Sequence, residues 1–311
     1  MSVIHIDRPF GLLEIDDHQL VGPGDERLGE AVVALAGGIR WDAARFDKAP
    51  KLIGLCRTGI GTDAIDLAEA TRRGVAVTNT PEGPTVSTAE HAIALMFAVA
   101  KTLGPHAQRL RDGVGNYADQ STALELDGLT LGLFGYGRIA RRVAQIAAGI
   151  GMRVIAHDPF VFQPDESVAM VDMDTLLAES NVISLHAPAA ADTANVFNAS
   201  TFAKCQRGVI LINCARGGLV DTAALVAALD SGKVAGAGLD VTAPEPLDPS
   251  HTLLHRDNVI VTPHIASCTV VGRQRMLDHA IEQARMILNG IEPSELVNTE
   301  ITHPDWDDLE A

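Results

Sequence analysis

Aromatic residues are scarce in this sequence, at 4% of 311 residues, and no apolar stretch is long. The longest apolar run, at 91–100, is too short to span a bilayer. The N-terminal stretch MSVIHIDRPF has an acidic residue, Asp7, near its start and lacks the long apolar core of a signal peptide. We therefore expect a cytoplasmic protein without a membrane partner, whose interior is filled by the small aliphatic residues that suit parallel sheets covered by helices.

Cysteine is also rare. The four cysteines are Cys56, Cys205, Cys214 and Cys268, and they form neither a CxxC pair nor a regular framework. The spacing predicts no disulfide and fits a reducing compartment. We expect no metal site.

Basic residues are outnumbered, with 24 Lys and Arg against 40 Asp and Glu and a formal net charge of −16. Such a surface repels phosphate backbones and anionic membranes, so a nucleic-acid partner is not expected. An anionic substrate would need a local positive site that works against this background.

The length suggests two domains, and short apolar runs alternate with helical patterns, as in βαβ units. This pattern predicts an α/β fold. The strands are expected at 31–35, 51–56, 75–80, 129–134, 152–157, 181–186, 208–213, 234–240 and 258–262, and the helices at 64–74, 88–104, 138–151, 221–233 and about 270–289. Segment 105–127 is expected to be irregular, and the acidic tail to be frayed.

The stretch LFGYGRIA joins an expected strand to an expected helix and matches the pattern G-x-G-x-x-G/A. Gly135 permits the tight turn, Gly137 lets the backbone approach a pyrophosphate, and Ala140 allows the helix to pack closely on the strand. The helix N-terminus would then face the phosphates with its free amides. A glycine-rich turn that serves packing alone is the structural alternative.

An acid at the end of the next strand strengthens this interpretation. Asp158 follows Gly137 by about 20 residues, where a carboxylate would bind the hydroxyls of the adenosine ribose. A 2′-phosphate would be repelled there, so the sequence favours NAD over NADP. Arg138 is expected either to lie along the pyrophosphate or to face solvent.

The stretch VIVTPHIAS places a histidine where a buried strand ends. His264 could simply satisfy backbone groups there, or it could be the proton donor that reduction of a carbonyl needs. Two earlier strand ends carry charged residues that fit the second possibility. Arg216, in NCARGGLVD, could bind the carboxylate of a substrate or pair with an acidic side chain such as Asp221.

The second partner is Glu245, in GLDVTAPEPLD, which is bracketed by two prolines. It could pair with His264, orient the imidazole and favour its protonated form, or it could be an ordinary surface glutamate. Each of the three residues alone is ambiguous. Because the carboxyl ends of parallel strands are where such sheets bind ligands, the set of Arg216, Glu245 and His264 predicts a site for hydride chemistry.

With these motifs, the chain resembles the D-isomer-specific 2-hydroxyacid dehydrogenases, in the branch of the phosphoglycerate dehydrogenases and the glyoxylate/hydroxypyruvate reductases. The resemblance extends over nearly the whole chain, including CRTGIGTDAIDL and TAEHAIAL near the N-terminus. It implies a Rossmann NAD-binding domain, residues 101–287, inserted into a flavodoxin-like substrate domain of residues 1–100 plus 288–311. It also implies a homodimer, NAD as the cofactor and a small anionic 2-hydroxy or 2-oxo acid as the substrate.

The resemblance further implies roles for individual residues. Arg216, Glu245 and His264 would be the catalytic set. The backbone amides of Thr58, Gly59, Ile60 and Gly61 would bind the substrate carboxylate together with Arg216, and His264 would contact the substrate as the proton donor. Arg57 matches the arginine that phosphoglycerate dehydrogenases use near the substrate phosphate. The cofactor would be approached by Thr80, Gly135, Tyr136, Gly137, Arg138, Ile139, Asp158, His186, Ala187, Pro188, Cys214, Ala215, Arg216, Asp240, His264 and Ala266.

Some alternatives stay open at this point. Arg57 alone supports a phosphorylated substrate, so glyoxylate, hydroxypyruvate or a sugar acid remain possible, and the stretch NTPEGPTVST leaves the substrate pocket undecided. The fold also occurs in an NAD-sensing corepressor and in dehydrogenases of formate or phosphite. Formate enzymes carry glutamine where Glu245 stands, which argues against that activity.

Overall fold

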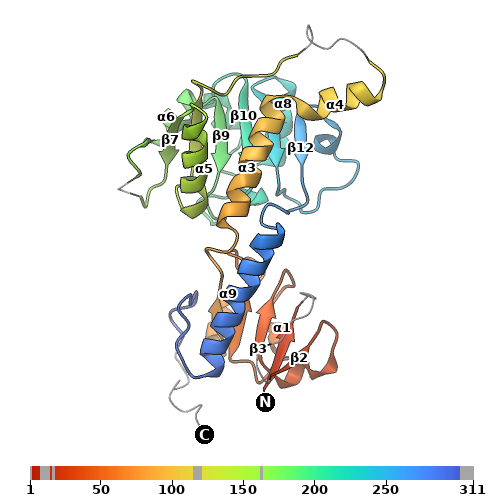
Figure 1. Ribbon diagram of the computed structural model, residues 1–311, viewed down its shortest axis with the longest axis vertical. Helices are drawn as coiled ribbons and strands as arrows, with labels where there is room; N and C mark the ends of the chain where they lie inside the picture. Colours follow the sequence, from red (N-terminus) through yellow and green to blue (C-terminus); the bar gives the residue numbers. More distant parts are fainter. Residues whose placement is uncertain (1, 8–14, 16–17, 115–120, 162–163, 302–311) are drawn as a thin grey trace. The chain divides into compact units, whose positions relative to one another are not determined.

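The computed structural model describes residues 2–7, 15, 18–114, 121–161 and 164–301 (Figure 1). The chain divides into two compact units, which we call unit 1 (Met1–Pro84 with Val270–Ala311) and unit 2 (Thr85–Thr269). Unit 2 thus lies in the chain between the two segments of unit 1.

The boundaries between the units differ from the expected ones, 100/101 and 287/288, by one helix each. Helix α3 (Thr85–Ala100) packs on strands of unit 2, and helix α9 (Val270–Leu288) packs on strands of unit 1. Each long helix therefore belongs to the unit whose sheet covers its apolar face. Helical periodicity shows that the helix has an apolar face but not which sheet covers it.

Unit 1 contains a five-stranded parallel sheet in the order β2-β1-β3-β4-β5, which is the flavodoxin-like order. The strands are β1 (Val3–Ile6), β2 (Gln19–Val21), β3 (Ala31–Ala36), β4 (Gly54–Arg57) and β5 (Ala76–Thr78), and the shorter helices are η1 (Glu26–Glu30), α1 (Ala43–Phe46) and α2 (Leu67–Arg72). Gly54 lets α9 pack close to β4, because a Cβ there would lie 2.7 Å from Ile287.

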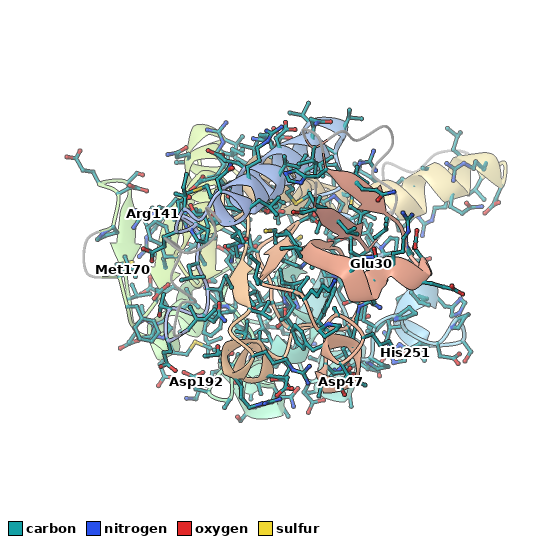
Figure 2. All side chains as sticks on the ribbon, turned by 90° about the horizontal axis from the view of Figure 1, so that it is seen from below. Glu30, Asp47, Arg141, Met170, Asp192 and His251 are labelled. Carbon is teal, nitrogen blue, oxygen red and sulfur yellow. The ribbon has the colours of Figure 1, made fainter. Side chains whose placement is uncertain are left out.

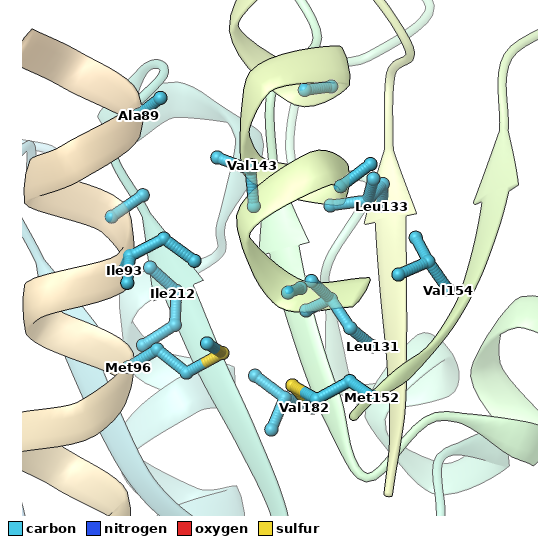
Figure 3. Packing of buried hydrophobic residues seen from close by; sticks show 14 of the residues in the cluster. Ala89, Ile93, Met96, Leu131, Leu133, Val143, Met152, Val154, Val182 and Ile212 are labelled. Atoms are coloured by element: carbon cyan, nitrogen blue, oxygen red, sulfur yellow. The ribbon is translucent and has the colours of Figure 1, made fainter. Parts of the chain in front are cut away.

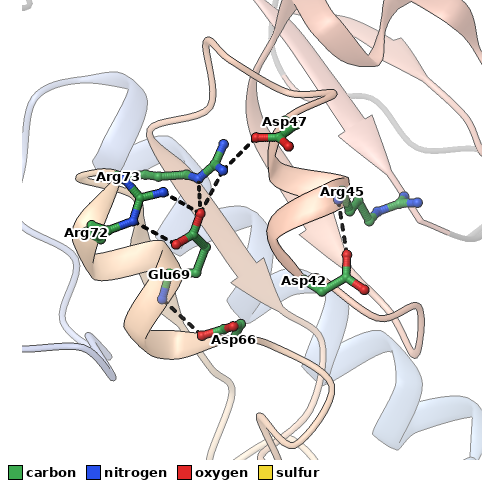
Figure 4. A network of polar contacts seen from close by, with 7 residues as sticks. All are labelled: Asp42, Arg45, Asp47, Asp66, Glu69, Arg72 and Arg73. Carbon is green, nitrogen blue, oxygen red and sulfur yellow. Dashed lines mark hydrogen bonds and ion pairs between the residues drawn. The ribbon is translucent and has the colours of Figure 1, made fainter.

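A surface network joins α2 to the end of α1 (Figure 4). The Glu69 carboxylate accepts hydrogen bonds from Arg72 and Arg73, and Arg73 also donates to Asp47, which follows α1. Its exposed pairs are screened by water, so the apolar core contributes more to the stability of this unit.

Unit 2 contains a seven-stranded parallel sheet in the order β12-β11-β10-β9-β6-β7-β8, which is the Rossmann order with one further strand. Its strands are β6 (Thr130–Phe134), β7 (Arg153–His157), β8 (Val168–Met170), β9 (Val182–Leu185), β10 (Val209–Asn213), β11 (Val234–Leu239) and β12 (Val259–Val261). Its other helices are α4 (Leu103–Arg111), α5 (Arg138–Gly149), α6 (Met173–Glu179), α7 (Ala199–Lys204), η3 (Gly217–Leu219), α8 (Thr222–Asp230) and η4 (Thr252–His255).

The core of unit 2 lies between its sheet and the helices on either face. On one face, α3 and α5 pack side by side, and Ile93 and Met96 of α3 lie beside Ile212 of the sheet in the same apolar cluster as Val143 of α5 (Figure 3). Asp221 caps α8 by accepting hydrogen bonds from the amides of Ala223 and Ala224.

All nine expected strands are found, although most are shorter than expected. Three edge or terminal strands, β1, β2 and β8, were not predicted from the sequence. The prediction of an irregular segment at 105–127 is wrong where α4 forms, because this helix buries no residue and so lacks the apolar pattern of a packed helix. The expected frayed tail falls largely outside the described residues. No helix within the described ranges is long and apolar enough to cross a membrane.

Glycines in β11 allow α3 to lie close to the sheet. A Cβ at Gly238 would lie 2.8 Å from the Leu95 side chain and 3.0 Å from that of Ile212. We expect Gly238→Val to lower the free energy of unfolding by ~2 kcal/mol, because the overpacked helix must shift. Ala235→Val, at an exposed position of the same strand, is the control and should change it little. Urea denaturation measures both variants, and equal stabilities would contradict this account of the packing.

Candidate active site

The residues of the predicted catalytic set follow the ends of three neighbouring strands of unit 2. Strands β10, β11 and β12 pair in parallel, with Asn213 opposite Leu239 and Leu239 opposite Val261. The segments that follow these strand ends carry Arg216, Glu245 and His264. The set therefore gathers at one carboxyl edge of the sheet, where open α/β sheets bind ligands.

The structure places Glu245 directly against His264. Nδ1 of the imidazole lies 2.7 Å from Oε1 of the carboxylate, and the two side chains are 50% and 42% exposed. A carboxylate on Nδ1 fixes the tautomer and the ring orientation, so that Nε2 is the nitrogen available to a substrate. The pair has the geometry of a general acid–base catalyst with its orienting group.

The backbone of His264 is left-handed, with φ 53°, which is unusual for a residue other than glycine. The neighbouring Asp240 holds this turn in place. Its carboxylate, almost fully buried, accepts hydrogen bonds from the amides of Ile265 (2.9 Å) and Ala266 (2.8 Å), and its carbonyl accepts one from the His264 amide (2.8 Å). The strained backbone is thus secured by three bonds to one residue.

Two further residues support Asp240, and the sequence analysis did not identify either. The Thr262 hydroxyl donates to the Asp240 carboxylate at 2.6 Å, and Nε2 of His91, on α3, lies 3.0 Å from the Thr262 oxygen. No sequence motif connects His91 with the 262–266 segment. Only the packing of α3 on the sheet brings them together.

The turn that carries Arg216 is held by Asn213, the last residue of β10. The side chain of Asn213 donates to the Arg216 carbonyl (2.9 Å) and accepts from the Ala215 amide (3.0 Å). The next residue must be small, because a Cβ at Gly217 would lie 2.0 Å from the Thr242 carbonyl oxygen. Gly217 thus allows the Arg216 turn to approach the segment that leads to Glu245. Because asparagine commonly bonds to the backbone of a turn, the role of Asn213 could have been inferred from the sequence.

The Glu245 segment is restrained by hydroxyl groups as well as by its two prolines. The Thr242 hydroxyl donates to the Pro244 carbonyl (2.8 Å), and the Thr222 hydroxyl donates to the Ala243 carbonyl (2.7 Å). These bonds hold the loop that presents the carboxylate to His264.

A cavity of about 380 Å³ within unit 2 lies beside the pair. Glu245 and His264 both line it, together with apolar side chains that include Leu247, Leu254 and Val261. A small molecule can therefore reach both groups from within this unit.

The glycine loop fits a dinucleotide. Gly135 has φ 88°, and a Cβ there would lie 2.6 Å from the Ala187 amide nitrogen, so only glycine allows the ends of β6 and β9 to meet. A Cβ at Gly137 would meet nothing within 4 Å, so the space beside it is open. Gly137 also begins α5 without a side chain, so no capping group stands between this helix N-terminus and phosphate oxygens.

Asp158 lies at the end of β7, next to this loop. Its carboxylate accepts hydrogen bonds from the amides of Tyr136 (2.8 Å) and Phe160 (2.9 Å). Ionised carboxylates can accept about four hydrogen bonds, so capacity remains for the two ribose hydroxyls of NAD. Arg138 is exposed, and Ile139 packs against the core.

Tyr136 has a second contact that the sequence did not predict. Its hydroxyl donates to Asp165 (2.7 Å), while the Arg141 guanidinium, labelled in Figure 2, lies 4.6 Å from the ring centre and 3.2 Å from Asp165. Burial, with the Asp165 contact, raises the pKa of Tyr136 to about 12, so the phenol stays protonated. Tyr136 therefore ties the glycine loop to both Asp158 and Asp165.

Other predicted cofactor contacts lie at the ends of β9 and β10. His186, Ala187 and Pro188 follow β9 beside Gly135, and Cys214 and Ala215 precede Arg216. Burial lowers the pKa of His186 to about 4, so its imidazole is neutral at pH 7. Burial, with the Asp240 charge, raises the pKa of the Cys214 thiol well above its usual range, which makes it a poor nucleophile.

The predicted substrate loop, 57–61, and Thr80 belong to unit 1. The Arg57 guanidinium donates to the carbonyls of Gly61 (3.0 Å) and Thr58 (2.9 Å), and Thr80 is fully buried with its amide donating to the Gly59 carbonyl (3.0 Å). The amides of Thr58 and Gly59 already donate to the carbonyls of Ala36 and Arg57. Of the four amides expected to bind a carboxylate, two are thus occupied.

Comparison with known proteins decides the family. Residues 93–266 match the family described as D-isomer specific 2-hydroxyacid dehydrogenase, NAD binding domain. The chain is 40% identical to a hydroxypyruvate reductase of Thermotoga maritima, over 81% of this chain and 82% of the relative. The chain belongs to the D-isomer-specific 2-hydroxyacid dehydrogenases. The resemblance seen in the sequence is confirmed, and NAD is the cofactor of this family's matched domain.

Two further comparisons agree with this family. A D-3-phosphoglycerate dehydrogenase of Archaeoglobus fulgidus is 42% identical over 80% of this chain, but the chain spans only about half of that relative, 47%. The TT0316 protein of Thermus thermophilus, a solved structure, superposes with a TM-score of 0.89 and 36% identity, over 95% of this chain and 100% of that one. The α/β fold with a Rossmann domain is confirmed.

Proposed function

We propose that this 2-hydroxyacid dehydrogenase interconverts an R-2-hydroxy acid and its 2-oxo acid, with NAD as the redox partner. The observation that carries the proposal is the 2.7 Å contact between His264 and Glu245, at the same sheet edge as the Arg216 turn. A proton donor with its orienting carboxylate, and an arginine at the same sheet edge, are what reduction of a carbonyl requires besides the hydride source.

When bound, NADH supplies the hydride to the carbonyl carbon of the 2-oxo acid. Nε2 of protonated His264 donates its proton to the carbonyl oxygen, while Glu245 stabilises the positive imidazole through Nδ1. In the oxidative direction the neutral imidazole accepts the hydroxyl proton. Exposure of both side chains lets His264 exchange its proton with solvent between turnovers.

Arg216 polarises the carbonyl and pairs with the substrate carboxylate. The guanidinium suits this role because it remains charged and presents a planar array of donors. It also supplies the local positive charge that an anionic substrate needs on a protein with a formal net charge of −16. In unit 1, the amides of Ile60 and Gly61, which donate to no acceptor in the described part of the chain, bind a carboxylate.

The substrate class is a small 2-oxo acid. Relatives named phosphoglycerate dehydrogenase and hydroxypyruvate reductase support, respectively, a phosphorylated and an unphosphorylated substrate. Glyoxylate and sugar acids remain candidates. The NAD-sensing alternative is less well supported, because the set of Arg216, Glu245 and His264 is intact, and Glu245 argues against formate as the substrate.

We expect His264→Ala to lower kcat for 2-oxo acid reduction by about 10²–10⁴-fold, because the proton donor is lost. The assay follows NADH oxidation with glyoxylate, hydroxypyruvate and phosphohydroxypyruvate, and NADH binding is measured in parallel. His255→Ala, at an exposed histidine of the same unit, is the control and should keep full activity. Unchanged turnover of the His264 variant would contradict the proposal.

We also propose a homodimer that forms through unit 2. Helix α4 buries no residue, and Leu103 and Leu110 on it are 55% and 65% exposed. Apolar side chains left uncovered on a helix mark a surface for another protein chain. Leu110→Glu should therefore shift the protein toward monomer in sedimentation velocity, and a wild-type protein that sediments as a monomer would contradict the proposal.

The cytoplasm remains the proposed location. It is supported by the four cysteines, all of which are free, and fractionation of the producing cell would test it.

A further inference from the structure

The loop after β4, Thr58–Gly61, has a donor on each of its carbonyl oxygens. The Arg57 guanidinium donates to two of these carbonyls, those of Thr58 (2.9 Å) and Gly61 (3.0 Å). The Thr80 amide donates to the Gly59 carbonyl (3.0 Å), and the side-chain amide of Asn79 donates to the Ile60 carbonyl (3.0 Å). Three residues thus bond all four carbonyls of the loop.

The amides of the same loop fall into two pairs. Those of Thr58 and Gly59 donate to backbone carbonyls, at 2.9 and 3.0 Å. Within the described part of the chain, the amides of Ile60 and Gly61 donate to no protein acceptor. Ile60 is 37% exposed, so solvent reaches this end of the loop.

The held carbonyls determine where these two amides point. In a trans peptide, the carbonyl of one residue and the amide of the next lie in one plane and point in opposite directions. Thr80 fixes the Gly59 carbonyl and so directs the Ile60 amide, and Asn79 fixes the Ile60 carbonyl and so directs the Gly61 amide. Two successive amides are therefore presented away from the donors, as in a backbone anion site.

Arg57 hydrogen-bonds to both ends of the loop, at the carbonyls of Thr58 and Gly61. Its guanidinium also donates to the Ala36 carbonyl (3.3 Å) and so anchors the loop to β3. Gly59, with φ 152°, makes room for it, because a Cβ there would lie 3.3 Å from the guanidinium carbon and from both terminal nitrogens. The positive charge of Arg57 lies on the carbonyl side of the loop and favours the binding of an anion at the amides.

We propose that Arg57 is a positioning residue, which holds the amides of Ile60 and Gly61 for the carboxylate that all 2-oxo acids share. Arg57 then does not distinguish phosphorylated from unphosphorylated substrates. This inference rests on the proposed function, and it assigns Asn79 to the same task. The presence of Arg57 is accordingly no sign of a phosphorylated substrate.

The test compares Arg57→Lys and Asn79→Ala with wild type on hydroxypyruvate and phosphohydroxypyruvate. Lysine keeps the charge but cannot span the carbonyls of Thr58 and Gly61, and the Asn79 variant keeps the charge of Arg57 untouched. Both variants should raise KM so that kcat/KM falls ~10-fold or more on each substrate, with the ratio between substrates unchanged. Arg40→Gln, at an arginine whose side chain is 77% exposed in the same unit, should change nothing.

A loss confined to phosphohydroxypyruvate in the Arg57 variant, with Asn79→Ala unchanged, would overturn the inference in favour of phosphate recognition. Unchanged kcat/KM in both variants would also overturn it. NADH affinity and the unfolding temperature of each variant show whether the fold is retained. If wild type reduces neither substrate, the proposed function fails on its own, and the inference is then tested by calorimetric binding of oxamate, which both variants should weaken equally.

Discussion

The arrangement of the candidate site depends on one buried carboxylate, that of Asp240. It lies at the end of β11, and its two oxygens accept hydrogen bonds from the amides of Ile265 and Ala266 and from the Thr262 hydroxyl. A buried carboxylate is stable only when its oxygens are bonded in this way. The same bonds hold His264 in the left-handed conformation that brings its imidazole to Glu245.

The rest of the site is assembled around this constraint by close approach of the backbone. Three parallel strands in register bring their ends together, and Gly217 lets the Arg216 turn lie against the Glu245 segment. Gly135 does the same for the dinucleotide loop and the end of β9. Since neither contact tolerates a side chain, the two glycines belong to the site although neither takes part in the chemistry.

Much of this could be predicted from the sequence. The glycine loop, Asp158 and the three strand ends with Arg216, Glu245 and His264 are local signals, because each depends on residues close together in the chain. Strand and helix positions follow from apolar periodicity for the same reason, whereas the exposed helix α4 lacks that pattern and was missed.

What the sequence could not provide depends on distant contacts. Asp240 was expected to approach the cofactor, and that contact stays a prediction, but the structure shows both of its oxygens bonded to the His264 turn. The support from His91 comes from a helix far away in the sequence, and Arg57 turns back onto carbonyls of its own loop. None of these partners could be read from spacing, because each is set by how the helices and strands pack.

The most direct test of this account is steady-state kinetics of Asp240→Asn at saturating NADH, together with its NADH affinity. The amide keeps one acceptor oxygen but places a donor against the loop amides, so the His264 turn loses its support. The account predicts that kcat at saturating NADH falls at least ~10-fold, whether or not NADH affinity also changes. An unchanged kcat would contradict it, and weakened NADH binding alone would limit the role of Asp240 to cofactor binding.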